Sequence, residues 1–408
     1  METHLAKFIR ATPEGDEAEA ILRACVHCGF CTATCPTYQL LGDERDGPRG
    51  RIYLIKQMLE GGAVTEKTRL HLDRCLSCRA CETTCPSGVN YHRLLDIGRQ
   101  VLAERLPRPA TTAAVRGALG ATLSRPGVFH VALGVGQRLR SVLPVALAER
   151  IPDPQAATAW PAPRHARQML VLDGCVQPAL APSINAAAAQ LLDAVGISFI
   201  RTASAGCCGA VRFHLDDQAG ARRDLRRLID AWWPGVVDGS EAIVVTASGC
   251  GTHLREAAHL LSDDPHYADK AARITALVRD PAEIVGVHAD ALLPLLRPLR
   301  EPVAVAFHSP CSLQHGLRIC GVVEALLQRA GYRLTAVADG HLCCGSAGTY
   351  ALLQPDLANR LRANKLAALN SGKPAIIATA NIGCLTHLQA ATTTPVRHWV
   401  ELLAARLR

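Results

Sequence analysis

The sequence predicts an α/β protein in which a mainly helical N-terminal module precedes two tandem copies of one α/β module. Its cysteines are grouped: of 17, eight lie before residue 106, none lies in 106–168, and nine follow. The last region also repeats its own motifs, which indicates a duplication. The composition, 49% hydrophobic and 20% charged over 408 residues, is typical of a globular chain. We therefore expect domains at 1–105, 169–300 and 301–408, with a helical linker over 106–168.

The duplication is visible in motif order and in spacing. MLVLDGC aligns with VAVAFHSPC, AGCCGA with HLCCGSAG, and AIVVTASGCGTH with AIIATANIGCLTH. The spacings are C-x31-CC-x41-C-x2-H and C-x31-CC-x39-C-x2-H. Apolar runs at 242–247 and 375–380 predict buried strands before Cys250 and Cys384. Because open α/β sheets bind ligands at the carboxyl ends of their strands, the thiols of each copy should converge.

The N-terminal module contains two matching cysteine runs. CVHCGFCTATCP begins at Cys25 and CLSCRACETTCP at Cys75, and both fit C-x2-C-x2-C-x3-C-P, the run of bacterial ferredoxins. In that run three thiolates bind one [4Fe–4S] cluster, and the fourth, before proline, binds the other. The sequence therefore predicts two [4Fe–4S] clusters. We assign Cys25, Cys28, Cys31 and Cys85 to the first (site 1), and Cys35, Cys75, Cys78 and Cys81 to the second (site 2).

Zinc is the alternative occupant of these runs, since four thiolates also suit zinc. Structural zinc sites use separated C-x2-C pairs, however, whereas three close cysteines and a distant Cys-Pro occur here twice. Paired iron–sulfur clusters imply electrons moving through the chain, which zinc does not support because it has no redox chemistry.

Charge and hydropathy limit where the chain acts. The first 20 residues lack the basic-then-apolar pattern of a secretion signal, and no apolar stretch has the roughly 18 residues of a membrane span. We expect a cytoplasmic protein. The segment between residues 106 and 168 contains eight arginines but only two acidic residues, Glu149 and Asp153. This basic segment could therefore dock an anionic bilayer or an acidic partner. The arginines are Arg108, Arg116, Arg125, Arg138, Arg140, Arg150, Arg164 and Arg167.

Over essentially the whole chain, the sequence resembles the iron–sulfur subunit family of bacterial glycolate oxidase. The resemblance is carried by CVHCGFCTATCPTYQLLGDERDGPRGRIYLIKQ, CETTCPSGVNYHRLLDIGR, and the CCG copies ending in SGCG and NIGCLTHL. Paired clusters followed by two CCG modules also resemble the anaerobic glycerol-3-phosphate dehydrogenase iron–sulfur subunit and heterodisulfide-reductase-type subunits.

The resemblance implies a complex at the cytoplasmic face of the inner membrane, where this chain is peripheral. Flavoprotein partner subunits would oxidise glycolate to glyoxylate, and D-lactate too, while this chain passes single electrons to a membrane acceptor, quinone. We expect the flavin in the partners and assign no catalytic residue here. Gly134-Val135-Gly136, the nearest match to a dinucleotide fingerprint, lacks the third glycine. Related subunits of glycerol-3-phosphate or lactate dehydrogenases remain alternatives.

In related CCG modules, the adjacent cysteines bridge the irons of a non-cubane cluster or contribute to a zinc site. This chain departs from the fuller pattern, because histidine replaces the last cysteine of C-x2-C in both modules. That departure puts the non-cubane cluster in doubt, and buried packing thiols are the other interpretation. The first-choice third iron–sulfur or zinc centre is Cys311, Cys343, Cys344, Cys384 and His387; the second choice is Cys175, Cys207, Cys208, Cys250 and His253.

Two other classes of function are alternatives to electron transfer. A CCG centre that reduces a disulfide would be favoured by intact C-x2-C ends, which this chain lacks. A basic nucleic-acid-binding protein would need a groove or stacking module, and no such module is recognisable, so no nucleic-acid partner is expected. Cys320, outside the repeat, is predicted to be a buried structural thiol.

Overall fold

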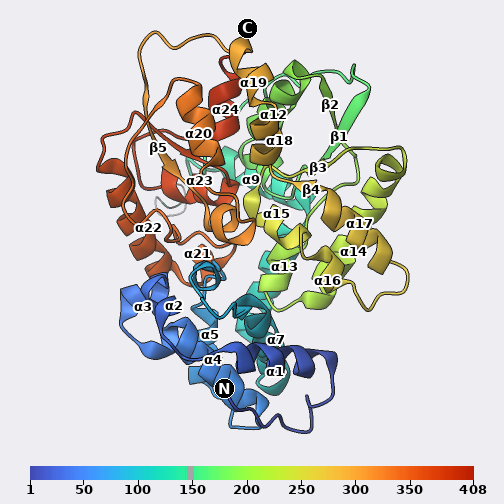
Figure 1. Cartoon of the computed structure of the whole chain (residues 1–408), viewed down its shortest axis with the longest axis vertical. Coiled ribbons are helices and arrows are strands. Elements are labelled where there is room, and N and C mark those ends of the chain that lie inside the picture. Colours follow the sequence, from blue (N-terminus) through green and yellow to red (C-terminus); the bar gives the residue numbers. More distant parts are fainter. Residues whose placement is uncertain (143, 145–150) are drawn as a thin grey trace. The chain divides into compact units, whose positions relative to one another are not determined.

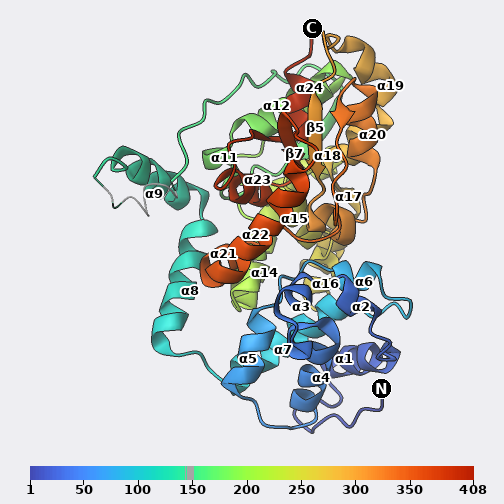
Figure 2. The same ribbon diagram turned by 90° about the vertical axis from the view of Figure 1, so that its left-hand side faces the viewer.

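The computed structural model describes residues 1–142, 144 and 151–408; Glu149 and Arg150 of the basic segment lie outside the described residues. The chain forms two compact units (Figures 1 and 2). The first comprises Met1–Val115 and Asp339–Lys365, and the second comprises Arg116–Ala338 and Leu366–Arg408. The first unit therefore includes a segment that the sequence analysis assigned to the last domain.

The N-terminal part of the first unit is helical, as predicted. Helices α4 and α7 pack closely because Gly98 has no side chain: a Cβ there would lie 2.8 Å from Cγ1 of Ile55. Its elements are α1 (Pro13–Ala24), α2 (Phe30–Ala33), α3 (Pro36–Leu41), a 3-10 turn (Glu44–Asp46), α4 (Pro48–Leu59), α5 (Glu66–Asp73), α6 (Ala80–Thr83) and α7 (Tyr91–Arg105).

The segment Asp339–Lys365 packs on this helical module within the first unit. It holds α21 (Tyr350–Leu353) and most of α22 (Pro355–Asn370). The Tyr350 hydroxyl donates to the Arg74 carbonyl at 3.1 Å, and the Arg360 guanidinium donates to the Leu40 carbonyl at 3.2 Å. These bonds join residues about 280 to 320 positions apart in the chain, so the fold places a loop of the second CCG copy beside the cysteine runs.

The second unit contains two parallel sheets with the same strand order, which confirms the predicted tandem α/β architecture. The strand that opens each copy is central, and the next strand in sequence lies at an edge, in the orders β2-β1-β3-β4 and β6-β5-β7-β8. The first sheet is β1 (Arg167–Val171), β2 (Ile197–Ile200), β3 (Ile243–Val244) and β4 (Val278–Arg279). The second is β5 (Ala304–His308), β6 (Arg333–Leu334), β7 (Ile376–Thr379) and β8 (Val396–His398).

Helices cover both sheets, and the buried Trp232 on α14 donates from Nε1 to the carbonyl of Val171 at 3.3 Å. The first copy has α11 (Gln177–Leu180), α12 (Ser183–Ala194), α13 (Ala210–His214), α14 (Gln218–Val237), α15 (Ser248–Leu254), α16 (Ala257–Leu260), α17 (Ala268–Leu277), α18 (Pro281–Val287) and α19 (Ala289–Leu292). The second has a π turn (Ser312–Gly316), α20 (Val322–Arg329), α23 (Ile382–Gln389) and α24 (Trp399–Ala404).

The two copies also contact each other within the second unit. The hydroxyls of Ser248 and Ser312 are 2.7 Å apart, and Nε2 of His398 lies 3.0 Å from the carbonyl oxygen of Thr246. Thr246 and Ser248 follow the end of β3, Ser312 lies in the turn after β5, and His398 is the last residue of β8. The ligand-binding edges predicted for the two sheets are therefore held at a common boundary.

The basic segment contributes α8 (Ala110–Leu123) and α9 (Pro126–Arg138). Several of its arginines pair with acids; for example, Arg116 bonds Asp216 at 2.9 Å. Helix α9, drawn in teal in Figure 2, has no buried residue. Among residues 1–142, 144 and 151–408, none of the helices combines the length and apolarity that crossing a bilayer requires.

Candidate metal centres

The two cysteine runs adopt the same local backbone conformation. In the first, His27 and Gly29 have φ of 56° and 86°; in the second, Ser77 and Arg79 have φ of 52° and 60°. Left-handed residues at matching offsets curl each loop, and a single-turn helix, α2 or α6, follows at once. Three of the four thiols of each run are thereby gathered on one short loop and turn.

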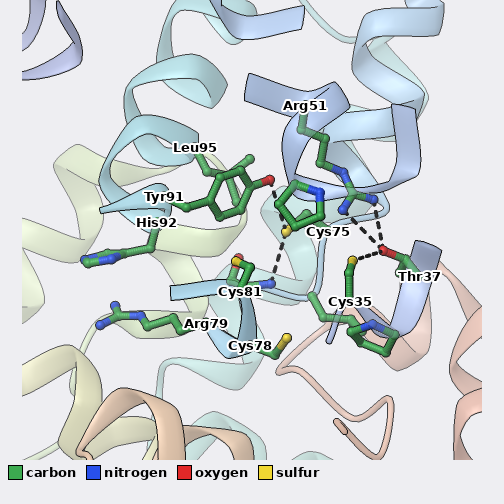
Figure 3. Close-up of a pocket in the computed structure, with 14 residues that line it drawn as sticks. Cys35, Thr37, Arg51, Cys75, Cys78, Arg79, Cys81, Tyr91, His92 and Leu95 are labelled. Carbon is green, nitrogen blue, oxygen red and sulfur yellow. Dashed lines mark hydrogen bonds between the residues drawn. The ribbon is translucent and has the colours of Figure 1, made fainter. Parts of the chain in front are cut away.

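Site 2 is a cavity lined by thiols from both runs. It has an empty volume of about 390 Å³. Cys75, Cys78 and Cys81 come from the second run, and Cys35 comes from the end of the first, immediately before α3. Figure 3 shows these side chains around the cavity together with Tyr91, Arg51 and Thr37.

Site 1 is a second cavity of about 440 Å³ with the reciprocal composition. Cys25, Cys28 and Cys31 come from the first run, and Cys85 comes from the end of the second. Cys81 also reaches this lining. The structure thus brings each predicted set of four thiols around one cavity, three from one run and one from the other.

Electrostatics disfavours these thiols as isolated charged groups. Burial, with the neighbouring Cys25, raises the pKa of Cys31 to about 11. Burial, with Cys78 next to it, also raises the pKa of Cys81 well above its ordinary value. Thiolate ligands need a strong local positive charge in such a place, and bound iron supplies one. Closely grouped sulfur donors in a buried cavity therefore fit an iron–sulfur cluster.

Polar groups reach the sulfur atoms of both sites. At site 2 the Tyr91 hydroxyl donates to Sγ of Cys75 at 3.7 Å, and the Ser77 amide donates to the same sulfur at 3.5 Å (Figure 3). At site 1 the Val89 amide donates to Sγ of Cys85 at 3.5 Å. Bonds of this kind orient ligands and tune a cluster.

A buried charge network behind site 2 escaped the sequence analysis. Arg51, 1% exposed, donates to the His71 carbonyl at 2.7 Å and to Oγ1 of Thr37 at 3.2 Å. Thr37 Oγ1 lies 3.3 Å from Sγ of Cys35 and donates to the Asp46 carbonyl at 2.8 Å. The only signal in the sequence was the charged stretch GDERDGPRGR between the runs, which has the composition of an ordinary solvated surface.

The first CCG copy brings its four cysteines into one cluster within the second unit. Cys175 and Cys208 each hydrogen-bond to Cys207, and Cys208 also contacts Cys250. Hydrogen bonds from Cys175 and Cys208, against the effect of burial, lower the pKa of Cys207. The pKa values of Cys175 and Cys208 are raised, because each thiol keeps its proton in its bond with Cys207 and is buried. The buried His253 also favours negative charge on Cys207.

The glycine of each CCG motif has a steric and a polar role. Gly209 and Gly345 have φ of 90° and 91°, and their amides donate to Sγ of Cys207 and Cys343 at 3.4 Å. A Cβ at Gly209 would lie 2.8 Å from the Ala221 carbonyl oxygen, and one at Gly345 would lie 2.7 Å from that of Ala358. Only glycine fits this left-handed turn against a helix.

The cysteines of the second CCG copy are divided between the units. Cys343 and Cys344 are buried in the first unit. In the second unit, Cys311 opens the π turn after β5, and Cys384 and His387 lie one turn apart on α23. Nδ2 of Asn381 is 3.6 Å from Sγ of Cys384. The prediction for Cys320 was wrong: it is exposed, because it follows the π turn on a surface loop before α20.

Comparisons with known proteins agree with this arrangement. A family model described as "4Fe-4S dicluster domain" matches residues 21–89, and one described as "Cysteine-rich domain" matches 169–255 and 305–389. The glycolate oxidase iron-sulfur subunit of Escherichia coli is 53% identical, covering 100% of this chain and 99% of that protein. A probable glycolate oxidase iron-sulfur subunit of Bacillus subtilis is 28% identical over 92% of this chain and 89% of its own length. Lactate utilization protein A of Bacillus velezensis is 24% identical over 57% of this chain and 97% of its own length.

The geometry of the CCG turns predicts that Gly209→Ala and Gly345→Ala destabilise the protein by about 2–4 kcal/mol each. Left-handed strain accounts for about 1–2 kcal/mol, and overlap with a helix carbonyl adds to it. The measurement is thermal unfolding followed by circular dichroism. Gly239→Ala is the matched control, because Gly239 has φ of 93° but nothing within 4 Å of its Cβ position. Equal losses in all three variants would contradict the steric argument.

Proposed function

The chain belongs to the glycolate oxidase iron–sulfur subunit family, and we propose that it relays electrons from a flavin in partner subunits to quinone in the membrane. The coarser statement, an iron–sulfur electron-transfer subunit of an oxidoreductase complex, follows from its 53% identity to such a subunit and its dicluster domain. The substrate, the flavin, the acceptor and the individual ligands belong to the proposal.

The observation that carries the proposal is the pair of thiol-lined cavities with exchanged fourth cysteines. We propose [4Fe–4S] clusters at site 1 and site 2, held by the cysteines assigned above. Such clusters accept and release single electrons. The chain's own contribution is to hold two sets of ligands on one rigid helical module, with Pro36 opening α3 directly after Cys35. Because the two loops interlock through Cys35 and Cys85, their relative position is fixed by both clusters.

Glycolate is the substrate that the relatives favour. The relative that aligns over the whole chain carries glycolate oxidase in its name. The shorter lactate utilization protein A aligns with only 57% of this chain. We therefore propose glycolate oxidation to glyoxylate by the partner subunits, with D-lactate as a second substrate. An equivalent subunit of a lactate or anaerobic glycerol-3-phosphate dehydrogenase is the alternative, as is a heterodisulfide-reductase-like catalytic subunit.

A third metal centre is part of the proposal, and its best support now lies in the first CCG copy. Cys175, Cys207, Cys208 and Cys250 form a continuous chain of contacts, with His253 close enough to act on Cys207. Four sulfur donors and a buried imidazole suit either iron or zinc. The set Cys311, Cys343, Cys344, Cys384 and His387 of the second copy remains a candidate.

We also propose that α9 is the segment that makes the chain peripheral to the membrane. Val128, Val131, Val135 and Leu139 are 46%, 65%, 46% and 48% exposed, and their spacing places them on one helix face. No acidic residue occurs between Glu104 and Glu149, and Arg125 and Arg138 flank the apolar face. An apolar face with basic flanks and no acids fits the surface of an anionic bilayer.

Reconstitution with the flavoprotein partners tests the electron-transfer function. We expect the purified full chain to leave glycolate unoxidised with an artificial acceptor, and to restore quinone reduction when added to the partner subunits. Cys28→Ser, which removes a site 1 ligand, should abolish that restoration while substrate still reduces the partners' flavin. Glycolate oxidation by the chain alone would overturn the proposal, and reduction of the partners' flavin by D-lactate but not glycolate would favour the lactate dehydrogenase alternative.

Metal analysis tests the third centre. The anaerobically purified chain should hold about eight irons from two four-iron clusters, plus further iron or zinc from a CCG centre. Cys207→Ser/Cys208→Ser should lose only the additional metal, whereas Cys343→Ser/Cys344→Ser reports separately on the second copy. Cys320→Ser is the control, since this exposed thiol is outside both sets. About eight irons and no zinc in all four proteins would make the CCG thiols packing residues.

Vesicle co-sedimentation tests the role of α9. Val131→Glu/Val135→Glu should weaken binding of the full chain to vesicles containing phosphatidylglycerol by about tenfold or more, because two apolar contacts with the bilayer are lost and negative charge is added. The control Val237→Glu/Val287→Glu changes two valines that are 67% and 82% exposed elsewhere in the second unit. Unchanged binding by the α9 variant, or an equal loss in the control, would assign membrane contact to another surface.

A further inference from the structure

The two thiol sites of the helical module differ in the hydrogen bonds that reach their sulfur atoms. At site 2, Cys75 receives both the Tyr91 hydroxyl and the Ser77 amide, at 3.7 and 3.5 Å. At site 1 the Val89 amide reaches Cys85. Hydrogen bonds to ligand sulfur stabilise the more negative, reduced form of an iron–sulfur cluster. By this criterion site 2 is the easier of the two to reduce.

Tyr91 is placed for this role by burial and orientation. Its ring lines both cavities, but its hydroxyl points to Cys75 (Figure 3). The side chain is 5% exposed, at the start of α7. A buried hydroxyl without a hydrogen-bond acceptor is costly, so its bond to the sulfur is maintained by the packing of α7.

The fixed charges near the two sites also favour reduction of site 2 over site 1. Behind Cys35, the guanidinium of Arg51 lies 3.5 Å from Asp46, and Arg74 shares that carboxylate at 2.9 Å. Two cations on one buried anion leave a net positive charge, and water screens it little. Arg99 adds a further guanidinium, which donates to the carbonyl of Cys75 at 3.0 Å. Beside site 1, by contrast, Arg49 forms a balanced pair with Glu44 at 2.6 Å.

Two features favour reduction of site 1 instead, but the structure limits the effect of each. The carboxylate of Glu82 is near Cys81 and adds to the rise in the pKa of that thiol, which burial and Cys78 raise more strongly. The amide and the ring of His92 both contact Glu82, however, and reduce the effect of its charge. Cys28 of site 1 is exposed, and water there helps to stabilise a reduced cluster. Water reorients around either oxidation state, whereas the guanidiniums of site 2 are fixed in place before the electron arrives.

We propose that Tyr91, together with the Arg51–Asp46–Arg74 charge network, makes site 2 the more readily reduced of the two sites. One electron then passes from site 1 to site 2; the first is oxidised, the second is reduced, and no bond or proton is exchanged. This direction of flow rests on the proposed electron-transfer function. The order of potentials rests only on the two proposed clusters, and it does not depend on the substrate, the partner subunits or the acceptor.

The position of site 2 gives this order a consequence. The hydroxyl of Tyr350 donates to the carbonyl of Arg74. Burial is the main cause that raises the pKa of Tyr350, and the nearby Cys75 and Cys343 raise it further. All of these residues lie in the first unit. An electron held at site 2 is therefore near the adjacent-cysteine loop of Cys343, which belongs to the same unit.

The test is a potentiometric titration of the full, cluster-loaded chain with dithionite, followed by electron paramagnetic resonance and without glycolate or partners. Wild type should show two reduction steps. In Tyr91→Phe, which keeps the ring and removes the donor, the higher step should shift to more negative potential while the lower one stays in place. Tyr53→Phe, on the 50% exposed tyrosine of α4, is the control and should change neither.

A second variant keeps the test decisive if Tyr91→Phe fails to retain iron. Thr37→Val removes the hydroxyl between Arg51 and Cys35, and Thr37 lines only site 2; it should move the same, higher step. A single reduction step in wild type, or variants that move the lower step or neither, would overturn the proposal. Because no substrate is present, a failure to act on glycolate would leave this result unaffected.

Discussion

The exchange of one cysteine between two runs is the constraint on which the rest of the first unit depends. Each cavity needs Cys35 or Cys85 from the far end of the opposite run, so the chain between them must return both ends to the same place. Helices α3, α4 and α5 make that return, and α7 closes it by packing through Gly98 onto α4. With clusters bound as proposed, loss of either one would release a ligand held by the other loop, so folding and metal binding would be coupled.

Both CCG copies use the same left-handed glycine turn to position their adjacent cysteines. A left-handed glycine against a helix carbonyl turns the chain, so that its amide points back to the first sulfur of the cysteine pair. In the first copy, neighbouring strand ends deliver Cys175 and Cys250 to the same turn. In the first copy the turn therefore presents sulfur at the carboxyl ends of the strands, where a parallel α/β fold concentrates its ligand contacts.

The features that could be predicted from the sequence are those that depend on the spacing of cysteines and the periodicity of apolar residues. The gathering of four thiols around each cavity, the duplicated α/β copies and the convergence around Cys207 all follow from short-range patterns. Contacts between distant residues carried no such signal: nothing in either segment indicates that Tyr350 bonds the carbonyl of Arg74. Arg51 was missed for a related reason, since a charged residue in a charged stretch is normally solvated, and only tertiary packing makes it buried.

The burial of Arg51 and Asp46 is itself informative. Removing an ion pair from water is expensive, and well-packed apolar residues in its place are often neutral or stabilising. Stability is therefore a weak explanation for the pair. A role toward the neighbouring sulfur atoms is a stronger one, because Thr37 links the guanidinium of Arg51 to Cys35 through contacts of 3.2 and 3.3 Å. In this module the charge network costs folding energy and places a fixed positive charge beside the sulfur atom of Cys35.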